Sequence, residues 1–312
     1  MTLKSTAPKA ITALVALAAL TATAGPAFAQ TSEPATASDA AAAGRPGGPV
    51  SCTSTRDPKL AERLSADISA ALRSRRSTAS VALYDQMTGT TCQYRAHRTY
   101  DAASTVKPIV LGALLQSKQG KLSPKDKALA AKMIIKSDNS ATTALWNKLS
   151  GARGVQAFLD SAGMRDTVPG RAGNWGLTKV SAADQLTLLK LFTQKNDVLN
   201  NASRTYALGL MNKVQADQRW GATAGAPASA LVHVKNGWLH RSSGRGIAPF
   251  ARKDWKINSM AAFTGRGHDR GLVVLTENNR PAAGHRPAAG KAYGIGTIEA
   301  VARVVHRDLA GR

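Results

Sequence analysis

The chain is poor in cysteine, histidine and aromatic residues. Its 312 residues include two cysteines and six histidines, and Phe, Trp and Tyr together make up 5%. The cysteines and histidines show neither C-x-x-C nor H-x-x-x-H spacing, so we expect no metal site and no cofactor. Basic and aromatic residues do not interleave as they do on base-stacking surfaces, which argues against a nucleic-acid partner.

Long apolar runs are missing after the first 30 residues, so we expect no membrane span. The N-terminus has two lysines, an apolar stretch at residues 11–20 and the tripeptide A-F-A that ends at Ala29. About ten apolar residues are too few for a bilayer, which takes about 20. Residues 1–29 are therefore predicted to be a secretory signal peptide cleaved after Ala29, which makes the mature protein extracellular.

Acidic residues are scarce, with 19 against 42 basic ones. Loss of residues 1–29 leaves a net charge of +21, which favours association with an anionic cell wall, although scattered basic residues more often form a solvated surface. Residues 30–50 are rich in Ala, Ser, Thr, Pro and Gly without apolar periodicity and are predicted to be a disordered linker. The folded domain is then 51–312, and we expect it to be a monomer because no coiled-coil pattern is present.

The two cysteines are Cys52 and Cys92. An exported chain meets an oxidising compartment, so we predict that they form a disulfide. Closing a loop of this length stabilises a fold by about 3–4 kcal/mol.

Strand and helix patterns alternate in an informative order. Short apolar strands are predicted, two early and three late, at 79–84, 91–94, 231–234, 257–263 and 272–275. Helical periodicity is found at 58–75, 125–135, 139–149, 153–162, 181–194, 203–214 and 291–309. We therefore predict an α/β (α+β) fold in which one antiparallel five-stranded sheet is flanked by the N- and C-terminal helices. An all-helical lobe, residues 108–225, is inserted into an α/β lobe formed by 51–107 plus 226–312.

A serine and a lysine stand three residues apart in Ser104-Thr105-Val106-Lys107, at the expected start of a helix. On a helix this spacing puts both side chains on one face. A serine hydroxyl is a weak nucleophile without a base, and a lysine can be that base only if burial or a second cation lowers its pKa. Ser104 is therefore a candidate nucleophile with Lys107 as its general base, and a plain helix start is the ordinary alternative.

Two further motifs follow. Ser137-Asp138-Asn139 lies where one predicted helix ends and the next begins, so Ser137 or Asn139 either caps that helix or takes part in chemistry. Lys235-Asn236-Gly237 closes the strand predicted from residue 231, where the glycine admits a substrate backbone and the lysine supplies a second cation. Taken alone, each motif has an ordinary structural explanation.

Ser-x-x-Lys, Ser-Asp-Asn and Lys-x-Gly occur in this order, each on the element that its chemistry needs. In this combination the chain resembles class A β-lactamases and the low-molecular-weight penicillin-binding proteins over nearly all of 51–312. The stretch from Lys136 to Leu159 is particularly similar. Residues 258–275, together with Tyr293-Gly294-Ile295, resemble β-lactamase-related serine hydrolases of unassigned activity.

The resemblance implies a β-lactamase/transpeptidase-like fold and roles for individual residues. Ser104 would be acylated, with Lys107 as general base, Ser137 as proton relay and Lys235 as electrostatic anchor. The implied substrate contacts are Asn139, Asn236, Gly237 and Trp238. The backbone N–H groups of Ser104 and Trp238 would form the oxyanion hole.

The chain departs from class A β-lactamases above all in its glutamates, since none lies between Glu62 and Glu277. In that family a loop glutamate activates the water that releases the acyl group. The corresponding loop, about residues 163–178, offers only the shorter Asp166 as a deacylation base. We therefore expect acylation followed by slow deacylation. Asn236 also stands where the family usually has Thr or Ser, and the cysteine pair is not at the family's familiar position.

Three functions are compatible with these features. The leading one is a secreted active-site serine hydrolase that forms an acyl-enzyme with a β-lactam or a related amide or ester. One alternative is an enzyme like the D-alanyl-D-alanine carboxypeptidases, which act on peptidoglycan. The other is a penicillin- or cell-wall-binding protein without turnover.

Overall fold

The computed structural model describes residues 48–241, 254–280 and 289–310, all of which belong to one compact unit, residues 42–312. The predicted signal peptide (1–29) lies outside the described residues, as does the predicted linker (30–50) except for its last three residues. Within the described ranges, no helix is both long enough and apolar enough to cross a membrane.

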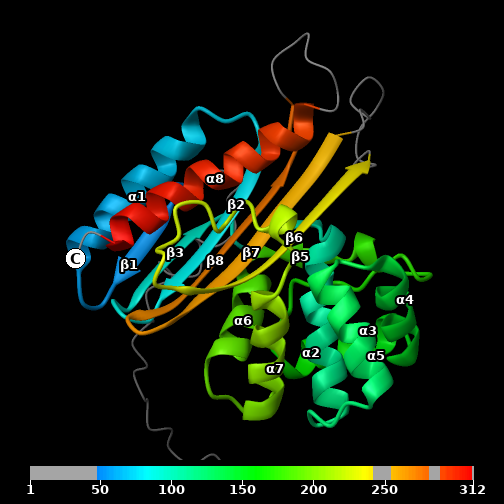
Figure 1. Ribbon diagram of the computed structural model, residues 1–312. Helices are drawn as coiled ribbons and strands as arrows, with labels where there is room; N and C mark the ends of the chain where they lie inside the picture. Colours follow the sequence, from blue (N-terminus) through cyan, green and yellow to red (C-terminus); the bar gives the residue numbers. More distant parts are fainter. Residues whose placement is uncertain (1–47, 242–253, 281–288, 311–312) are drawn as a thin grey trace, which may run out of the picture. The chain divides into compact units, whose positions relative to one another are not determined.

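Six strands form one antiparallel sheet in the order β1-β3-β2-β8-β7-β6, and two others form a separate pair, β4-β5 (Figure 1). The strands are β1 (Ser51–Ser54), β2 (Thr78–Asp85), β3 (Thr90–Tyr94), β4 (Thr99–Asp101), β5 (Lys179–Ser181), β6 (Leu231–Arg241), β7 (Asp254–Gly265) and β8 (His268–Glu277). The helices are α1 (Pro58–Arg73), α2 (Lys107–Ser117), α3 (Pro124–Ile135), α4 (Asn139–Lys148), α5 (Ala152–Ser161), α6 (Ala182–Thr193), α7 (Asn201–Asn212) and α8 (Ala289–Ala310). Short 3-10 turns lie at η1 (Ala103–Val106), η2 (Trp175–Leu177) and η3 (Ala216–Gln218).

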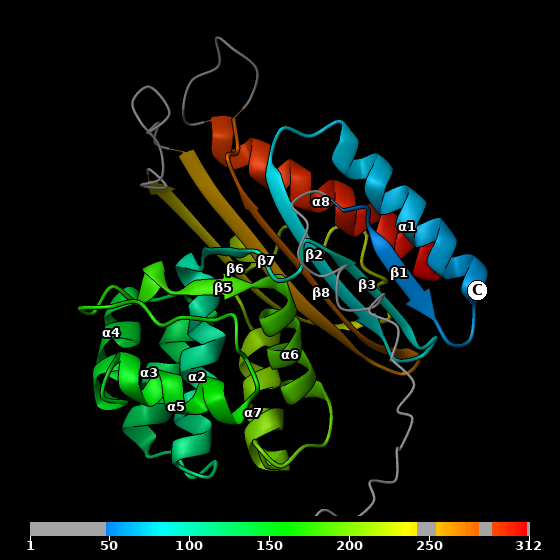
Figure 2. The same cartoon turned by 180° about the vertical axis from the view of Figure 1, so that it is seen from behind.

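The sheet separates two layers of helices. Helices α1 and α8 pack side by side on one face, and α2 to α7 lie on the other (Figures 1 and 2). The sequence of α1 explains its place in this arrangement. Asp57 caps its first turn by accepting a hydrogen bond from the backbone N–H of Leu60, 3.0 Å away. Leu60, Leu64 and Ile68 recur every four residues and are all buried, so one stripe of the helix faces the core.

Helix α2 lies at the centre of the helical layer. Every residue from Lys107 to Leu115 is buried, whereas a helix at the protein surface has one face exposed to solvent. Lys107 therefore enters the protein interior as the first residue of a helix that is surrounded by apolar side chains. This placement removes water from its amine and sets the conditions for its chemistry.

The predicted fold class is confirmed: an antiparallel sheet flanked by the first and last helices, with the remaining helices inserted between the strands. The sheet has six strands, not five, because β1 was missed. Its four residues, S-C-T-S, alternate between exposed and half-buried and carry no apolar signal. The lobe boundaries at 107/108 and 225/226 stay a prediction.

Two details of the strands bear on the predicted motifs. Cys52 of β1 lies directly opposite Cys92 of β3, and the two form the predicted disulfide. Strand β6 is longer than predicted, because its pairing with β7 continues from Leu231 to Arg241. Lys235-Asn236-Gly237 therefore lies inside a strand, and the prediction of a strand end was wrong.

Candidate active site

Ser104 lies in η1, the single turn that joins β4 to α2. The residue before it, Ala103, has a φ of 49°, a left-handed conformation that is uncommon for a residue with a side chain. The surrounding protein holds this turn from two sides. Asn258 of β7 donates to the carbonyl oxygens of Asp101 (2.8 Å) and Ala102 (3.2 Å). Gln185 of α6 donates to the carbonyl oxygen of Thr105 (3.1 Å).

Strand β6 passes unusually close to the Ser104 turn at Gly237. A Cβ atom built on this glycine would lie 2.7 Å from the backbone nitrogen of Ser104 and 2.9 Å from both the Ala102 oxygen and the Thr105 nitrogen. Such distances are shorter than any ordinary contact, so only glycine fits here. The close approach brings the backbone of β6 next to the backbone N–H of Ser104.

Lys107 connects the first motif to the second. Its Nζ donates to the carbonyl oxygen of Ser137 (2.5 Å), to Ser137 Oγ (3.0 Å) and to Asn139 Oδ1 (2.9 Å). Ser137 has a φ of 55°, a left-handed conformation, and both its carbonyl and its hydroxyl reach the same amine. The helix cap that follows is supplied by Asp138, whose carboxylate accepts from the N–H of Ala141 (2.6 Å). The capping role considered for Ser137 and Asn139 was therefore wrong, and both side chains face Lys107.

Lys235 reaches the same hydroxyl. Its Nζ donates to Ser137 Oγ (3.0 Å) and to the carbonyl oxygen of Asn236 (2.9 Å). The three motifs, which are spread over more than 130 residues of sequence, thus meet at one serine hydroxyl held between two lysine amines. Neither lysine is exposed to solvent, each having a relative accessibility of 0%.

Burial changes the charge that these two amines carry. Desolvation lowers the pKa of Lys107 from its usual value to about 8, against a weaker opposing effect of the Asp138 carboxylate. Desolvation likewise lowers the pKa of Lys235 to about 7, and the nearby positive charge of Lys107 adds to the decrease. A lysine with a pKa near neutrality can give up its proton and act as a base in the physiological range.

A tryptophan covers Lys107. The ring centroid of Trp175, in η2, lies 5.2 Å from Lys107 Nζ, a cation–π distance. The indole Nε1–H of Trp175 donates to Thr143 Oγ1 of α4, 3.1 Å away. Trp175 belongs to the loop at about residues 163–178, where the sequence had indicated only Asp166 as a candidate.

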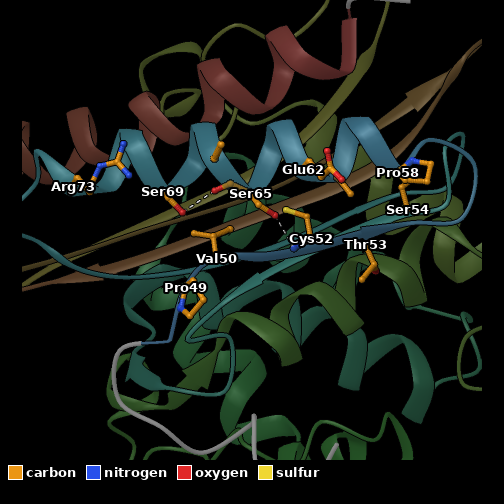
Figure 3. Close-up of a pocket in the computed structure, with 12 residues that line it drawn as sticks. Pro49, Val50, Cys52, Thr53, Ser54, Pro58, Glu62, Ser65, Ser69 and Arg73 are labelled. Atoms are coloured by element: carbon orange, nitrogen blue, oxygen red, sulfur yellow. Dashed lines mark hydrogen bonds between the residues drawn. The ribbon is translucent and has the colours of Figure 1, made fainter.

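A cavity of about 410 Å³ opens at Ser104. Its lining residues come from η1, α4, the η2 region and β6: Ala103, Ser104, Asn139, Gly173, Asn174, Trp175, Gly176, Leu177, Trp238 and Leu239. A larger cavity of about 740 Å³ lies away from the candidate residues, between β1 and α1 (Figure 3). We therefore place the candidate site in the smaller cavity.

The side chains of Asn236 and Trp238 lie on the other face of β6. Side chains alternate along a strand, so Lys235 and Gly237 share the face toward Ser104. Asn236 Nδ2 donates to the carbonyl oxygens of Gln218 (2.9 Å) and Trp220 (2.8 Å). The ring of Trp238 lies 6.1 Å from that of Trp220 and 4.5 Å from Lys291 Nζ, centroid distances that place it outside the lysine cluster. The part of Trp238 that can serve Ser104 is its backbone.

Asp166 is engaged elsewhere. Its carboxylate pairs with His97 Nδ1 (2.8 Å), and its backbone N–H donates to Asp184 Oδ2 (2.9 Å). It does not belong to the cavity lining given above. This position disfavours Asp166 as a base for water at Ser104.

Sequence reasoning missed three residues of this site: Trp175, Asn258 and Gln185. Asn258 and Gln185 are buried polar residues inside an apolar strand and an apolar helix, and such residues normally have a hydrogen-bonding task. That signal was available, but only the fold shows that both act on the Ser104 turn. In the described part of the chain, no three His, Cys, Asp or Glu side chains are grouped as metal ligands.

Comparison with known proteins found a matching family model and solved structures with a similar fold. The family model described as "Beta-lactamase enzyme family" matches residues 62–128 and 127–283. A β-lactamase from Xanthomonas campestris superposes with a TM-score of 0.65 at 21% identity, over 81% of this chain and 99% of the other. A class A β-lactamase representative from Bacteroides cellulosilyticus gives 0.64 at 17% identity, over 81% and 99%. The class A β-lactamase from Mycobacterium abscessus gives 0.62 at 18% identity, over 79% and 99%. No curated protein matches the chain in sequence.

Proposed function

Because this chain belongs to the β-lactamase enzyme family, we propose that it is a secreted serine hydrolase acylated at Ser104 by a β-lactam or a related amide or ester. One observation carries the proposal above the others: the Ser137 hydroxyl is shared by two buried amines, Lys107 and Lys235, beside the cavity that contains Ser104. A structural role gives no reason to bury two cations around one hydroxyl, since desolvation of each is costly.

The chemistry follows from the lowered pKa values. Neutral Lys107 accepts the proton of Ser104 as Ser104 Oγ attacks the carbonyl carbon of the substrate, and an acyl-enzyme ester forms as the amide bond breaks. Ser137, which bonds both amines, can pass a proton to the leaving nitrogen. Lys235 bonds the same Ser137 hydroxyl and, when protonated, attracts an anionic substrate group.

The negative charge that develops on the carbonyl oxygen needs backbone donors. The N–H groups of Ser104 and Trp238 are proposed for this task, supported by the close approach of β6 to η1 at Gly237. Asn139, which accepts from Lys107 and lines the cavity, is proposed to contact the amide of the substrate. Asn236 and Gly237 are proposed to act through the β6 backbone, since the Asn236 amide is bonded to the carbonyl oxygens of Gln218 and Trp220.

We propose further that release of the acyl group is slow. No glutamate lies between Glu62 and Glu277, and Asp166 pairs with His97. These two observations favour the alternative of a penicillin- or cell-wall-binding protein without turnover over rapid hydrolysis. Secretion is supported by the disulfide between Cys52 and Cys92. A monomeric state and attraction of the basic chain to an anionic cell wall complete the proposal.

The test is the intact mass of the purified protein over time with benzylpenicillin, beside a Ser104→Ala variant and a Ser140→Ala control. Ser140 is an exposed serine in the first turn of α4, and neither lysine amine donates a hydrogen bond to it. We expect an adduct of one benzylpenicillin in the wild type and the control, and none in Ser104→Ala. Loss of the drug without a lasting adduct would instead indicate rapid hydrolysis. A synthetic peptide ending in D-alanyl-D-alanine, incubated in parallel, tests the carboxypeptidase alternative through release of D-alanine.

A further inference from the structure

Trp175 lies against the Lys107 amine and is also a lining residue of the cavity that contains Ser104. The Lys107 amine already donates to the Ser137 carbonyl, the Ser137 hydroxyl and the Asn139 side chain. The indole ring of Trp175 lies over the same amine at 5.2 Å. A hydrogen bond to Thr143 fixes one edge of the ring to α4.

The same ring is part of the wall of the cavity that contains Ser104. Among the described lining residues, none carries a carboxylate that could activate water; the polar groups are Ser104 and the amides of Asn139 and Asn174. Leu177 and Leu239 make the remaining wall apolar. Lys107, three residues after Ser104, is the proposed base, and Trp175 both contacts its amine and lines the cavity.

Resting on the proposed acylation of Ser104, we propose that Trp175 is a positioning residue that keeps water from Lys107 and thereby prolongs the life of the acyl-enzyme. Release requires a water oxygen to bond to the ester carbonyl carbon while the bond from that carbon to Ser104 Oγ breaks. One proton of the water passes through a base to Ser104 Oγ, and the other leaves with the acyl group as a carboxylic acid. A water held away from Lys107 cannot give up the first proton.

The indole ring acts on Lys107 in a second way. Its negative face favours the charged amine, and a protonated lysine cannot accept a proton from water. Burial by the same ring opposes this effect, because desolvation is the largest cause of the lowered Lys107 pKa. The two effects of the ring on the Lys107 pKa therefore oppose each other, and the main consequence of removing the ring is that water reaches the amine.

The experiment measures formation and decay of the benzylpenicillin adduct separately, by intact mass, after removal of excess drug. Trp175→Leu and Trp175→Ala open the cavity, and Trp175→Phe keeps an aromatic ring but loses the bond to Thr143. Trp220→Leu is the matched control. Trp220 is also half-buried and packs against Trp238, but Trp220 itself is not a lining residue of the cavity.

We expect the adduct to decay about tenfold faster or more in Trp175→Leu and Trp175→Ala, while the rate of acylation at saturating pH stays within about threefold of wild type. Trp175→Phe should keep a long-lived adduct, and Trp220→Leu should decay at the wild-type rate. Faster decay together with an unchanged rate of acylation is a separation of the two steps that a purely structural role of the tryptophan would not cause.

Equal adduct lifetimes in wild type, Trp175→Leu and Trp175→Phe would overturn the inference and leave the proposed function intact. If Trp175→Ala does not fold, Trp175→Leu, which keeps apolar bulk, decides the question. Absence of any adduct in the wild type would overturn the proposed function, and this inference with it, so the two failures are distinguishable.

Discussion

The substitution Gly237→Ala tests how closely β6 must approach the Ser104 turn. The added Cβ would lie 2.7 Å from the Ser104 nitrogen, 2.9 Å from the Ala102 oxygen and 2.9 Å from the Thr105 nitrogen, whereas ordinary contacts begin at 3.4 Å. All three neighbours are backbone atoms, so no side-chain rotation can relieve the contact. Either β6 or η1 must move by roughly half an ångström or more.

Two consequences follow from this displacement. Overpacking of this kind costs about 1–3 kcal/mol of the free energy of unfolding. A shift of the proposed nucleophile and of the proposed oxyanion donors by up to about 1 Å would lower the rate of acylation by as much as about 100-fold. We therefore expect Gly237→Ala to lower the melting temperature and to slow adduct formation strongly.

The measurements are the second-order rate of adduct formation with benzylpenicillin and the midpoint of thermal unfolding. Gly176→Ala is the matched control: Gly176 lines the same cavity, and a Cβ atom there would meet nothing within 4 Å. We expect this control to acylate at the wild-type rate with unchanged or slightly raised stability. If Gly237→Ala acylates like Gly176→Ala and melts at the wild-type temperature, the close approach of β6 does not position Ser104.

Four further outcomes are expected. The rate of acylation should rise with pH to a plateau, with a midpoint near the Lys107 pKa of about 8, since only the neutral amine accepts a proton; a rate that is flat from pH 6 to pH 9 would contradict this role. Because the pKa of Lys107 is lowered in the folded state, the unfolded chain binds more protons than the folded one between about pH 8 and 10.5. Resistance to urea should therefore increase with pH in this window. The increase should be smaller in Lys107→Met. Reduction of the disulfide between Cys52 and Cys92 should destabilise the fold by about 2–4 kcal/mol in urea titrations. Acylation in the folded fraction should stay unchanged, because β1 is remote from the cavity. Asn258→Ala should lower the free energy of unfolding by about 1–3 kcal/mol and slow acylation, because the buried carbonyls of Asp101 and Ala102 lose their donor; unchanged adduct kinetics would show that the turn holds itself.

The helices could be read from the sequence because their signals are local. Apolar residues at intervals of four in α1, a capping aspartate before it and proline in its first turn mark its start and its buried face. Most other predicted helices agree with the structure to within a residue or two at either end. Strand β1 was missed because its residues carry no apolar alternation; its pairing with β3, not its own sequence, makes it a strand.

The candidate site likewise contains residues that the sequence indicates and a residue that only the fold reveals. The order of three short motifs, a property of the sequence alone, predicts four site residues: Ser104, Lys107, Ser137 and Lys235. Trp175 could not be identified in this way. Nothing near it in the sequence indicates that its ring lies over a lysine 68 positions earlier in the chain, since that contact depends on the packing of the 163–178 loop against α4.

By itself, the sequence determined which residue types are present for the chemistry and which are missing: a serine with a lysine one helical turn away, a second lysine, and no glutamate in the middle of the chain. Only the tertiary structure determined how readily the two lysines lose a proton and which groups these side chains contact. Burial lowers the pKa values of Lys107 and Lys235, and the Ser137 backbone turns its hydroxyl between them. The same packing pairs Asp166 with His97. Desolvation and side-chain pairing depend on groups that are distant in sequence, and for that reason they appear only once the chain is folded.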